Sequence, residues 1–270
     1  MTHITTPEAE VLLDQPIPVL DHGFVRLVDY MGSDARIVQS ARVSYGAGTK
    51  TLREDKMLID YLLSNEHMSP FEMVVFTFHL KMPIFVARQL VRHRTARMNE
   101  ISGRYSEMKD EFYMPEIDRV SFQKRSNRQG SSRREVPGEL RERVRDIMAE
   151  TEKSSYSGYD EMIQAGITRE LARTVLPLSI YTEMYWQMDL RNLLHFIKLR
   201  LDGHAQYEIR VYAEAMARCV KAVTPLTWEA FEEHVLGAVK LSRSQAAELA
   251  RELEAVSPEV ARRYRLKKEG

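Results

Sequence analysis

The run from Phe71 to Pro83 constrains the fold of this 270-residue chain more than any other stretch. Its β-branched and aromatic residues cluster as they do in β-strands, and Pro83 marks the end of the predicted strand. Proline is also common in the first turn of a helix, and Ile84, Ala87 and Val91 follow at helical spacing. The sequence therefore predicts a strand that leads directly into a helix over residues 84–96.

The rest of the chain is mainly helical, with two further strand segments. Residues 17–31 have the pattern of a strand that leads to a turn at Gly32, and residues 178–188 have that of another strand. Apolar residues at helical spacing predict helices over 33–44, 52–64, 138–166, 168–175, 190–201, 207–223, 228–237 and 242–256. We expect three parts: an N-terminal extension over 1–16, one domain over 17–235, and a charged helical tail over 236–270.

Composition limits the classes of function. Lys+Arg and Asp+Glu both number 39, so the net charge gives no global reason to expect nucleic acid or an anionic membrane as a partner. The single cysteine, Cys219, allows no intramolecular disulfide, and no targeting or membrane-spanning segment is recognisable, so we expect a cytoplasmic protein. Motifs of Rossmann, P-loop, zincin, serine-hydrolase and thiol-redox proteins are absent, and the dispersed histidines do not suggest a metal site.

Three places carry polar side chains that suggest chemistry. On the predicted helix 84–96, Gln89, Arg92 and His93 share one face, although cations also favour a helix C-terminus for structural reasons. After it, the segment Ser102–Gly103–Arg104 offers a hydroxyl, close backbone N–H groups and a guanidinium to an anion, and an ordinary turn is the equal alternative.

The third place is the predicted helix 190–201. Arg200 lies on or beside its apolar face, where a cation that cannot lose its proton needs a partner or an anionic ligand. A structural ion pair or a snorkelling side chain would satisfy it equally. Arg191 and His195 lie at i and i+4 on the polar side, and Arg173 lies near the end of the preceding predicted helix. By itself Arg173 fits a solvated cation best, whereas Arg191 and His195 could equally be a surface pair.

The string RHRTARMNEISGRYS, residues 92–106, resembles the signature RHRxxSxNExSxRY of the flavin-dependent thymidylate synthases, the ThyX family. It departs at Arg97, where the family often has Ser. The blocks GFVRLVDYMG, ARVSYG, SPFE, FTFHLKMPIFVARQ, ARTVLP and RNLLHFIKLRLDGHAQYEIR also resemble the family in order and separation, so that the resemblance covers roughly residues 20–235.

The resemblance implies a fold and an activity. The expected fold is α+β, with a mixed or mainly antiparallel sheet flanked by helices and a helical subdomain. The expected activity is the reductive methylation of dUMP to dTMP, with methylenetetrahydrofolate as carbon donor and NADPH as reductant through bound FAD. The resemblance also implies a homotetramer whose active sites are shared between subunits.

Site residues follow from the resemblance position by position. The expected FAD contacts are Ser44, Ser69, Glu72, Arg92, His93, Arg94, Glu100, Asp189, Arg191 and His195. Asp189 stands where some members have Asn. The expected dUMP contacts are Gln89, Arg92, Ser102, Gly103, Arg104, Arg173 and Arg200.

Elementary chemistry assigns roles within the dUMP set. Arg104, Arg173 and the backbone N–H groups of 102–104 suit a phosphate, whereas Arg200 suits the pyrimidine edge, where a fixed cation would stabilise negative charge on N3 and O4. We therefore expect Arg200 to be the catalytic residue. Cys219 lies in an apolar helix without an adjacent base, and no His or Lys is placed by sequence to activate Ser102, so neither is expected to be a nucleophile.

Two other functions compete with this interpretation. The basic stretch 119–145 could bind RNA through phosphate contacts, but only one aromatic residue, Phe122, is interleaved to stack on bases. An inactive FAD-binding homologue is the second alternative, which the departures at Arg97 and Asp189 leave open.

Overall fold

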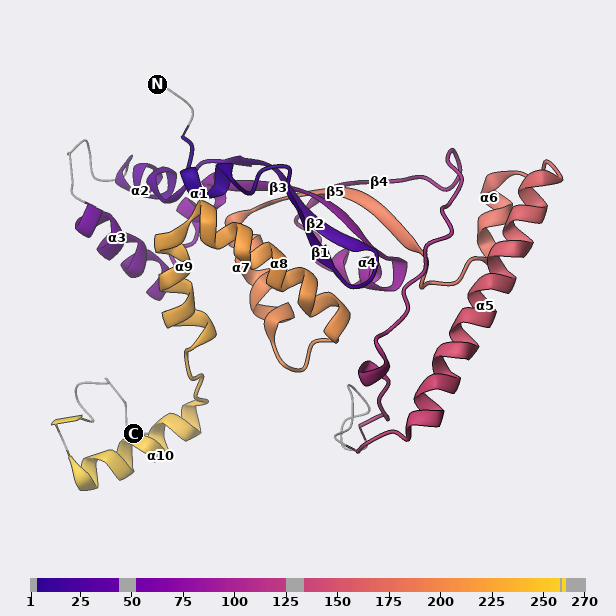
Figure 1. The fold of residues 1–270 in the computed structure, drawn as a ribbon. Helices are drawn as coiled ribbons and strands as arrows, with labels where there is room; N and C mark the ends of the chain where they lie inside the picture. The colour runs from indigo at the N-terminus through magenta and orange to yellow at the C-terminus, as the bar shows by residue number, and fades with distance from the viewer. Residues whose placement is uncertain (1–3, 44–51, 125–133, 258, 261–270) are drawn as a thin grey trace. The chain divides into compact units, whose positions relative to one another are not determined.

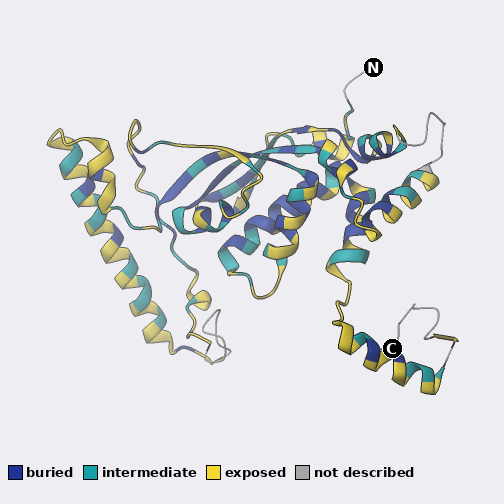
Figure 2. Ribbon diagram, turned by 180° about the vertical axis from the view of Figure 1, so that it is seen from behind, coloured by how far each residue is buried: buried dark blue, intermediate teal, exposed yellow. Residues whose placement is uncertain are grey.

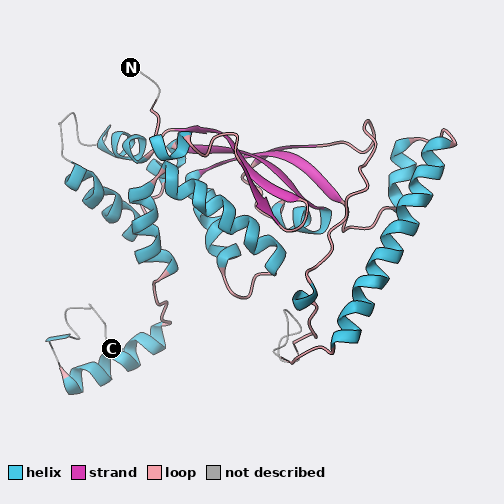
Figure 3. Cartoon of the chain, viewed as in Figure 1, coloured by secondary structure: helices cyan, strands magenta, loops and turns pink. Residues whose placement is uncertain are grey.

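The computed structural model describes residues 4–43, 52–124, 134–257 and 259–260. The chain divides into two compact units, Met1–Phe231 and Glu232–Gly270. The first contains all the strands among the described residues, and the second is helical (Figure 3).

One antiparallel sheet forms the centre of the first unit. Its strands are β1 (Pro16–Val19), β2 (Gly23–Met31), β3 (Val75–Pro83), β4 (Arg97–Glu100) and β5 (Tyr181–Asp189), in the order β1-β2-β3-β5-β4 (Figure 1). The longest pairing joins β3 to β5, from Val75 opposite Asp189 to Pro83 opposite Tyr181. The α+β fold with a mainly antiparallel sheet is therefore confirmed.

The sheet buries one face and leaves the other polar, because successive side chains of a strand point to opposite faces. Phe76, Phe78 and Leu80 of β3 and Met184, Trp186 and Met188 of β5 are almost fully buried. Helices α4 (Ile84–Leu90), α7 (Leu190–Leu201) and α8 (Tyr207–Val223) cover this face, where the buried residues concentrate (Figures 1 and 2). Each large apolar side chain buried there contributes about 1.5–3 kcal/mol.

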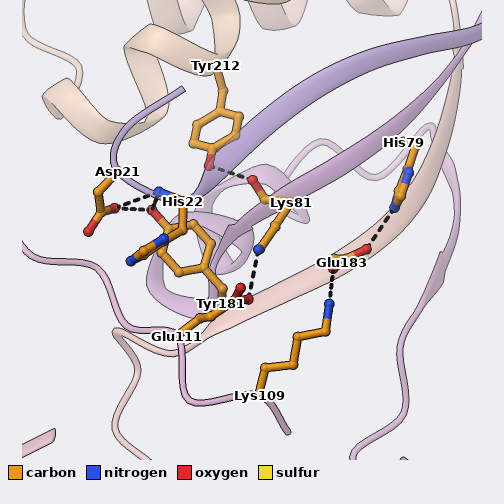
Figure 4. A network of polar contacts seen from close by, with 9 residues as sticks. All are labelled: Asp21, His22, His79, Lys81, Lys109, Glu111, Tyr181, Glu183 and Tyr212. Atoms are coloured by element: carbon orange, nitrogen blue, oxygen red, sulfur yellow. Dashed lines mark hydrogen bonds and ion pairs between the residues drawn. The ribbon is translucent and has the colours of Figure 1, made fainter. Parts of the chain in front are cut away.

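The opposite face of the sheet carries a network of polar contacts (Figure 4). His79 and Glu183 lie on it with Nε2 and Oε2 3.1 Å apart, and the Lys81 ammonium lies 2.7 Å from Glu111 Oε2. The Tyr181 hydroxyl donates to Asp21, which lies between β1 and β2. These contacts fix the segment that follows the signature, residues 107–114, against the end of the sheet.

Four helical elements surround the β2–β3 end of the sheet. They are α2 (Asp34–Arg42), α3 (Leu52–Ser64), η2 (Ser69–Met73) and α9 (Pro225–Phe231). A further short helix, α1 (Pro7–Glu10), packs on α8. The turn predicted at Gly32 is present, with a φ of 83° that favours glycine. Asp34 accepts hydrogen bonds from the N–H groups of Leu226 and Thr227, so α2 caps the first turn of α9.

A smaller core joins α5 to the rest of the first unit. It contains Met108, Tyr159, Ala172 and Ile180, which come from α5 (Gly138–Gln164), α6 (Arg169–Ala172) and the segments that precede α5 and β5. The short η4 (Arg173–Val175) packs against α5. Figure 2 shows that most of α5 is exposed or half-buried. A short turn, η3 (Ile117–Arg119), ends where the basic stretch 119–145 begins, and residues 125–133 of that stretch are outside the described part.

The second unit contains η5 (Glu232–Leu236) and α10 (Arg243–Val256). Ser242 and Gln245 form a reciprocal capping box at the start of α10. The helix predicted over 242–256 is thus present. Across the described residues, no helix combines the length and the apolar character that a membrane span requires.

The predicted helix over 84–96 is wrong in its second half. Helix α4 ends at Leu90, and the N–H groups of Arg92 and His93 bond to carbonyl groups three residues back, which tightens the chain into turns. The chain then pairs with β5 as β4, an edge strand of four exposed residues without apolar alternation. Local propensity did not predict this strand, because its pairing partner is more than 80 residues away.

Candidate functional site

The start of α7 gathers several of the predicted FAD residues. Strand β5 ends at Asp189, which caps α7 by accepting hydrogen bonds from Asn192 N at 3.0 Å and Asn192 Nδ2 at 2.7 Å. Two residues after Asp189, the Arg191 guanidinium pairs with Glu72 on η2, which also carries Ser69 at its start. Ser44, predicted with this group, lies outside the described residues.

Further along α7, His195 and Arg200 approach His93, which lies in the turns after α4. The rings of His93 and His195 lie with their centroids 6.3 Å apart, and Arg200 Nε donates to His93 Nε2 at 3.1 Å. The Phe196 ring meets the His93 ring edge to face at 4.9 Å. Burial, and then the positive charge of Arg200, lower the pKa of His93 from 6.5 to about 4, so its imidazole is neutral at pH 7.

The predicted common helical face of Gln89, Arg92 and His93 is wrong. These residues do not share a face, because α4 ends before the RHR run. Gln89 lies on α4 and donates from Nε2 to Gln206 Oε1 at 2.6 Å, whereas Arg92 and Arg94 lie in the turns after it. The turns after α4 place the His93 ring against Phe196 and Arg200 of α7.

A second cluster surrounds the loop after β4. Gly103 is buried there, and a Cβ atom at this position would lie 3.1 Å from both Arg173 Cδ and Met108 Sδ. The Arg173 side chain thus packs against the backbone of Gly103, where any larger residue would be in close contact with it. Arg104 Nε donates to Glu170 Oε2 at 3.0 Å, and Arg104 N donates to Ser102 Oγ at 3.3 Å.

Two signature residues of β4 lie on opposite faces of the sheet. Glu100 accepts a hydrogen bond from the buried Thr182 hydroxyl at 2.6 Å, on the face that α4 and α7 cover. Arg97 pairs with Gln187 across the strands and donates to its Oε1 at 3.5 Å, on the polar face. The residue that departs from the signature therefore points away from Glu100.

The structure brings the predicted residues into two groups. The first, the α7 cluster, contains Ser69, Glu72, Gln89, His93, Asp189, Arg191, His195 and Arg200. The second, the loop cluster, contains Ser102, Gly103, Arg104 and Arg173. Within the described residues, no hydrogen bond, ion pair or ring contact joins a member of one group to a member of the other.

Several residues that the sequence did not single out hold the predicted ones. Gln206 contacts Gln89, and Glu170 pairs with Arg104. Glu170 precedes Arg173 by three residues, so both lie on adjacent turns, but no local pattern indicated that Arg104 would approach them. These contacts depend on long-range packing.

The lone thiol takes no part in either cluster. Cys219 is fully buried on α8, its Sγ lies 3.6 Å from Ala215 O, and burial raises the pKa of the thiol to about 12. A thiolate is therefore absent at neutral pH. This agrees with the expectation that Cys219 is a core residue.

A cavity of about 410 Å³ lies elsewhere, beside α5. It is lined by Asp110, Phe112, Ala149, Glu152, Lys153, Tyr156, Ser157 and Asp160. None of the predicted site residues lines it. In the parts of the chain that the structure describes, no group of three or more His, Cys, Asp or Glu side chains is arranged to hold a metal ion.

The donors in the two clusters suit phosphate-bearing ligands. Arg191 and His195 offer N–H groups on α7, and Arg92 and Arg94 are exposed in the turns after α4; cations of this kind fit the diphosphate of a dinucleotide such as FAD. Arg104, Arg173 and a buried glycine fit a single phosphate. The fold is α+β, and the donors of the two clusters have the chemistry that a nucleotide-binding protein requires.

Comparison with known proteins makes this class specific. The family model described as "Thymidylate synthase complementing protein" matches residues 26–226. The flavin-dependent thymidylate synthase of Treponema denticola is 57% identical over 244 residues, which cover 90% of this chain and 89% of that protein. An enzyme of the same description from Thermus thermophilus is 57% identical over 229 residues, which cover 85% of this chain and 83% of that protein. The chain belongs to the family of flavin-dependent thymidylate synthases.

A solved structure shows the same fold. The UMP/dUMP methylase PolB from Streptomyces cacaoi, bound with 5-Br UMP, superimposes with a TM-score of 0.72 at 32% identity. The match covers 81% of this chain and 97% of that one. The fold expected from the resemblance is thereby confirmed.

Proposed function

We propose that this chain, as a flavin-dependent thymidylate synthase, converts dUMP to dTMP with methylenetetrahydrofolate as carbon donor and NADPH as reductant through FAD. One observation carries the proposal. The two halves of the family signature contribute to different clusters: His93 of RHR lies in the α7 cluster, and Ser102, Gly103 and Arg104 of SGRY lie in the loop cluster, and the donors of these clusters suit a dinucleotide and a nucleotide monophosphate. The chain's identity to curated synthases over most of its length supports the same activity.

The α7 cluster is the proposed FAD site. We assign FAD contacts to Ser44, Ser69, Glu72, Arg92, His93, Arg94, Glu100, Asp189, Arg191 and His195. The arginines would bind the diphosphate through charge-assisted hydrogen bonds, and the flavin would supply the hydride for reduction. Asp189 uses both carboxylate oxygens to cap α7, so its contact with FAD would be shared with that structural role.

The proposed dUMP site draws on both clusters: Gln89, Arg92, Ser102, Gly103, Arg104, Arg173 and Arg200. Arg104 and Arg173 would receive the phosphate together with the backbone N–H groups of the loop. A phosphate carries about two charges at neutral pH against one on Glu170, so it would compete effectively for Arg104. Ser102 Oγ accepts from Arg104 N, which suits a binding role rather than nucleophilic attack.

Arg200 is the proposed catalytic residue. A half-buried guanidinium is a fixed positive charge, and burial lowers its pKa without removing its proton at neutral pH. Placed at the pyrimidine edge, it would stabilise negative charge that develops on N3 and O4 during reduction and carbon transfer.

A homotetramer would bring the two clusters together. In one chain no described contact joins them, and the apolar side chains of Leu171, Val175 and Leu178, which lie within five residues of Arg173 in sequence, are exposed. Exposed apolar patches of this kind mark protein interfaces. We propose that active sites are shared between subunits, so that the loop cluster of one chain serves the α7 cluster of another.

The boundaries and the location are proposals of the same kind. We propose that residues 17–235 form the catalytic domain, with 1–16 as an extension and 236–270 as a helical tail. A cytoplasmic location is supported by the single, buried cysteine.

The purified protein tests the activity directly. We expect a yellow solution whose flavin absorbance is bleached by NADPH, and tritium release from 5-tritiated dUMP that depends on methylenetetrahydrofolate. A colourless protein that takes up no added FAD would overturn the proposal. Steep salt-dependent RNA binding without flavin would favour the RNA-binding alternative.

The role of Arg200 is tested by Arg200→Lys. Lysine keeps the charge but lacks the planar fork, so we expect a loss of turnover of about 10²–10³-fold with FAD content unchanged. The measurement is tritium release together with flavin absorbance per subunit. A near-normal rate would contradict the activating role.

A further inference from the structure

We propose that His93 is a positioning residue for Arg200, which holds the guanidinium in place through a neutral imidazole so that its positive charge stays uncompensated. The inference rests on the proposed function of Arg200 and extends it. It differs from the proposed contact of His93 with FAD, because here His93 acts through another side chain.

The geometry gives His93 the acceptor role. A guanidinium only donates, so the 3.1 Å contact requires that Nε2 of His93 has no proton and accepts from Arg200 Nε. The proton of the neutral ring is then on Nδ1. Arg200 Nη2 also points to Gln89 O, at 3.5 Å, so the guanidinium is held at two of its three nitrogens.

The surroundings keep His93 in that orientation and that state. Phe196 packs edge to face on the ring from one turn before Arg200. Partial burial and the neighbouring Arg200 and His195 disfavour the imidazolium form. A protonated ring would place a further positive charge beside Arg200 and could not accept its hydrogen bond.

A neutral acceptor can position a buried arginine without cancelling its positive charge. A buried arginine is most often held by a carboxylate, which also cancels its charge. An imidazole fixes the direction of the guanidinium and leaves the full positive charge for a pyrimidine that becomes anionic. Within the described residues, Nη1 of Arg200 has no hydrogen-bond partner, which leaves that edge for the ligand.

Two substitutions at position 93 distinguish the effect of positioning Arg200 from the effect of cancelling its charge. His93→Gln keeps a neutral acceptor near the place of Nε2, whereas His93→Glu provides an acceptor of the same length that carries a negative charge. We expect kcat of His93→Gln to exceed that of His93→Glu by about tenfold or more. If holding Arg200 were sufficient, the two variants would be equally active or His93→Glu would be the better enzyme.

A double-mutant cycle separates action through Arg200 from a direct or structural role. His93→Leu removes the acceptor, and we expect it to lower kcat by about tenfold in the wild-type background. In the Arg200→Lys background the same substitution should lower kcat by less than about twofold, because the guanidinium that His93 positions is already absent. Equal losses in both backgrounds would overturn the proposal.

Binding measurements keep the result independent of flavin loading. FAD per subunit and the dUMP dissociation constant, from absorbance and calorimetry, are measured for every variant. His204→Leu, one turn beyond Arg200 and strongly exposed, is the matched control and should change neither. A loss of FAD that accounts for the whole loss of rate in His93→Leu would contradict the positioning role.

Nitrogen-15 spectra of the histidines test the proposal even where wild-type protein has no synthase activity. His93, assigned by its absence in His93→Gln, should be a neutral Nδ1–H tautomer at pH 7. An Nε2–H tautomer would overturn the inference alone. A wild-type protein without flavin or turnover would overturn the proposed function alone.

Discussion

The environments of single residues in this protein are not indicated by their neighbours in sequence. His93 lies between two arginines of the signature, yet its ring is half-buried and bonded to Arg200, 107 residues away. Gly103 lies in a polar turn, yet it is buried because the Arg173 stem passes over it. In both cases a distant side chain defines the environment of the residue.

Gly103→Ala tests the close approach in the loop cluster. The added methyl group would lie 3.1 Å from Arg173 Cδ and Met108 Sδ, so these side chains have to give way by a few tenths of an ångström, which disturbs the position of Arg173 at the proposed phosphate site. We expect the dUMP dissociation constant to rise about tenfold with FAD content unchanged, because a charge-assisted hydrogen bond is weakened.

The control for this variant is Gly158→Ala. No atom lies within 4 Å of a Cβ added at Gly158, which is in the interior of α5. This substitution should leave dUMP binding unchanged and raise stability by about 0.5–1 kcal/mol. Equal binding by wild-type protein and Gly103→Ala would refute the role of this close approach.

The pKa of His93 predicts a pH dependence of stability. The folded-state pKa, about 4, lies below the ordinary value of 6.5, so between these values the unfolded chain takes up a proton more readily. Stability is therefore present above pH 6.5 and is lost as the pH falls toward 4. Arg200 and His195 on α7 face the ring, and Arg92 and Arg94 flank it in sequence.

Thermal unfolding of wild-type protein and His93→Gln between pH 7 and pH 4 measures this effect. The Tm of the wild type should fall relative to that of the variant as the medium becomes acidic, because glutamine does not titrate. Parallel curves would show that His93 is not a buried neutral group.

At the scale of elements, packing set the ends of helices and the pairing of the edge strand. The sequence predicted the strand–helix junction at Pro83 and the α7 helix, because periodicity and proline act locally. It did not predict that α4 ends at Leu90 or that the polar residues 97–100 pair with β5. Backbone pairing across the sheet requires no apolar pattern in an exposed edge strand.

The contact of Asp34 with α9 is a link between elements that can be tested. Its carboxylate accepts from Thr227 Oγ1 at 2.6 Å as well as from two backbone N–H groups, and burial raises its pKa. Asp34→Ala should lower the free energy of unfolding by about 2–3 kcal/mol, because buried donors lose their acceptor. Asp34→Asn, which keeps one acceptor oxygen, should lose less in denaturant titrations.

At the scale of the whole molecule, the proposed function requires assembly. Leu178, five residues after Arg173 in the chain, is 61% exposed, and Val11, near the start of the chain, is 75% exposed. Leu178→Asp should weaken the proposed tetramer of 31.4 kDa chains and lower activity with it, because a charge would be buried at the interface.

Val11→Asp is the matched control and should leave assembly intact. Sedimentation velocity gives the oligomeric state, and tritium release gives the activity of the same samples. A fully active monomer of the wild-type chain would refute shared active sites. Activity that falls in Leu178→Asp without any change in assembly would refute the proposed interface.

The sequence by itself determined the family, the α+β class, the main helices and the set of residues that the proposed sites use. These properties depend on local patterns and on motifs that are read along the chain. Only the tertiary structure decided that His93 faces Arg200, that Arg97 and Glu100 lie on opposite faces of the sheet, and that the predicted residues form two separate clusters in one chain. The physical reason is that these relations arise from packing and strand pairing between distant segments, which no local pattern encodes.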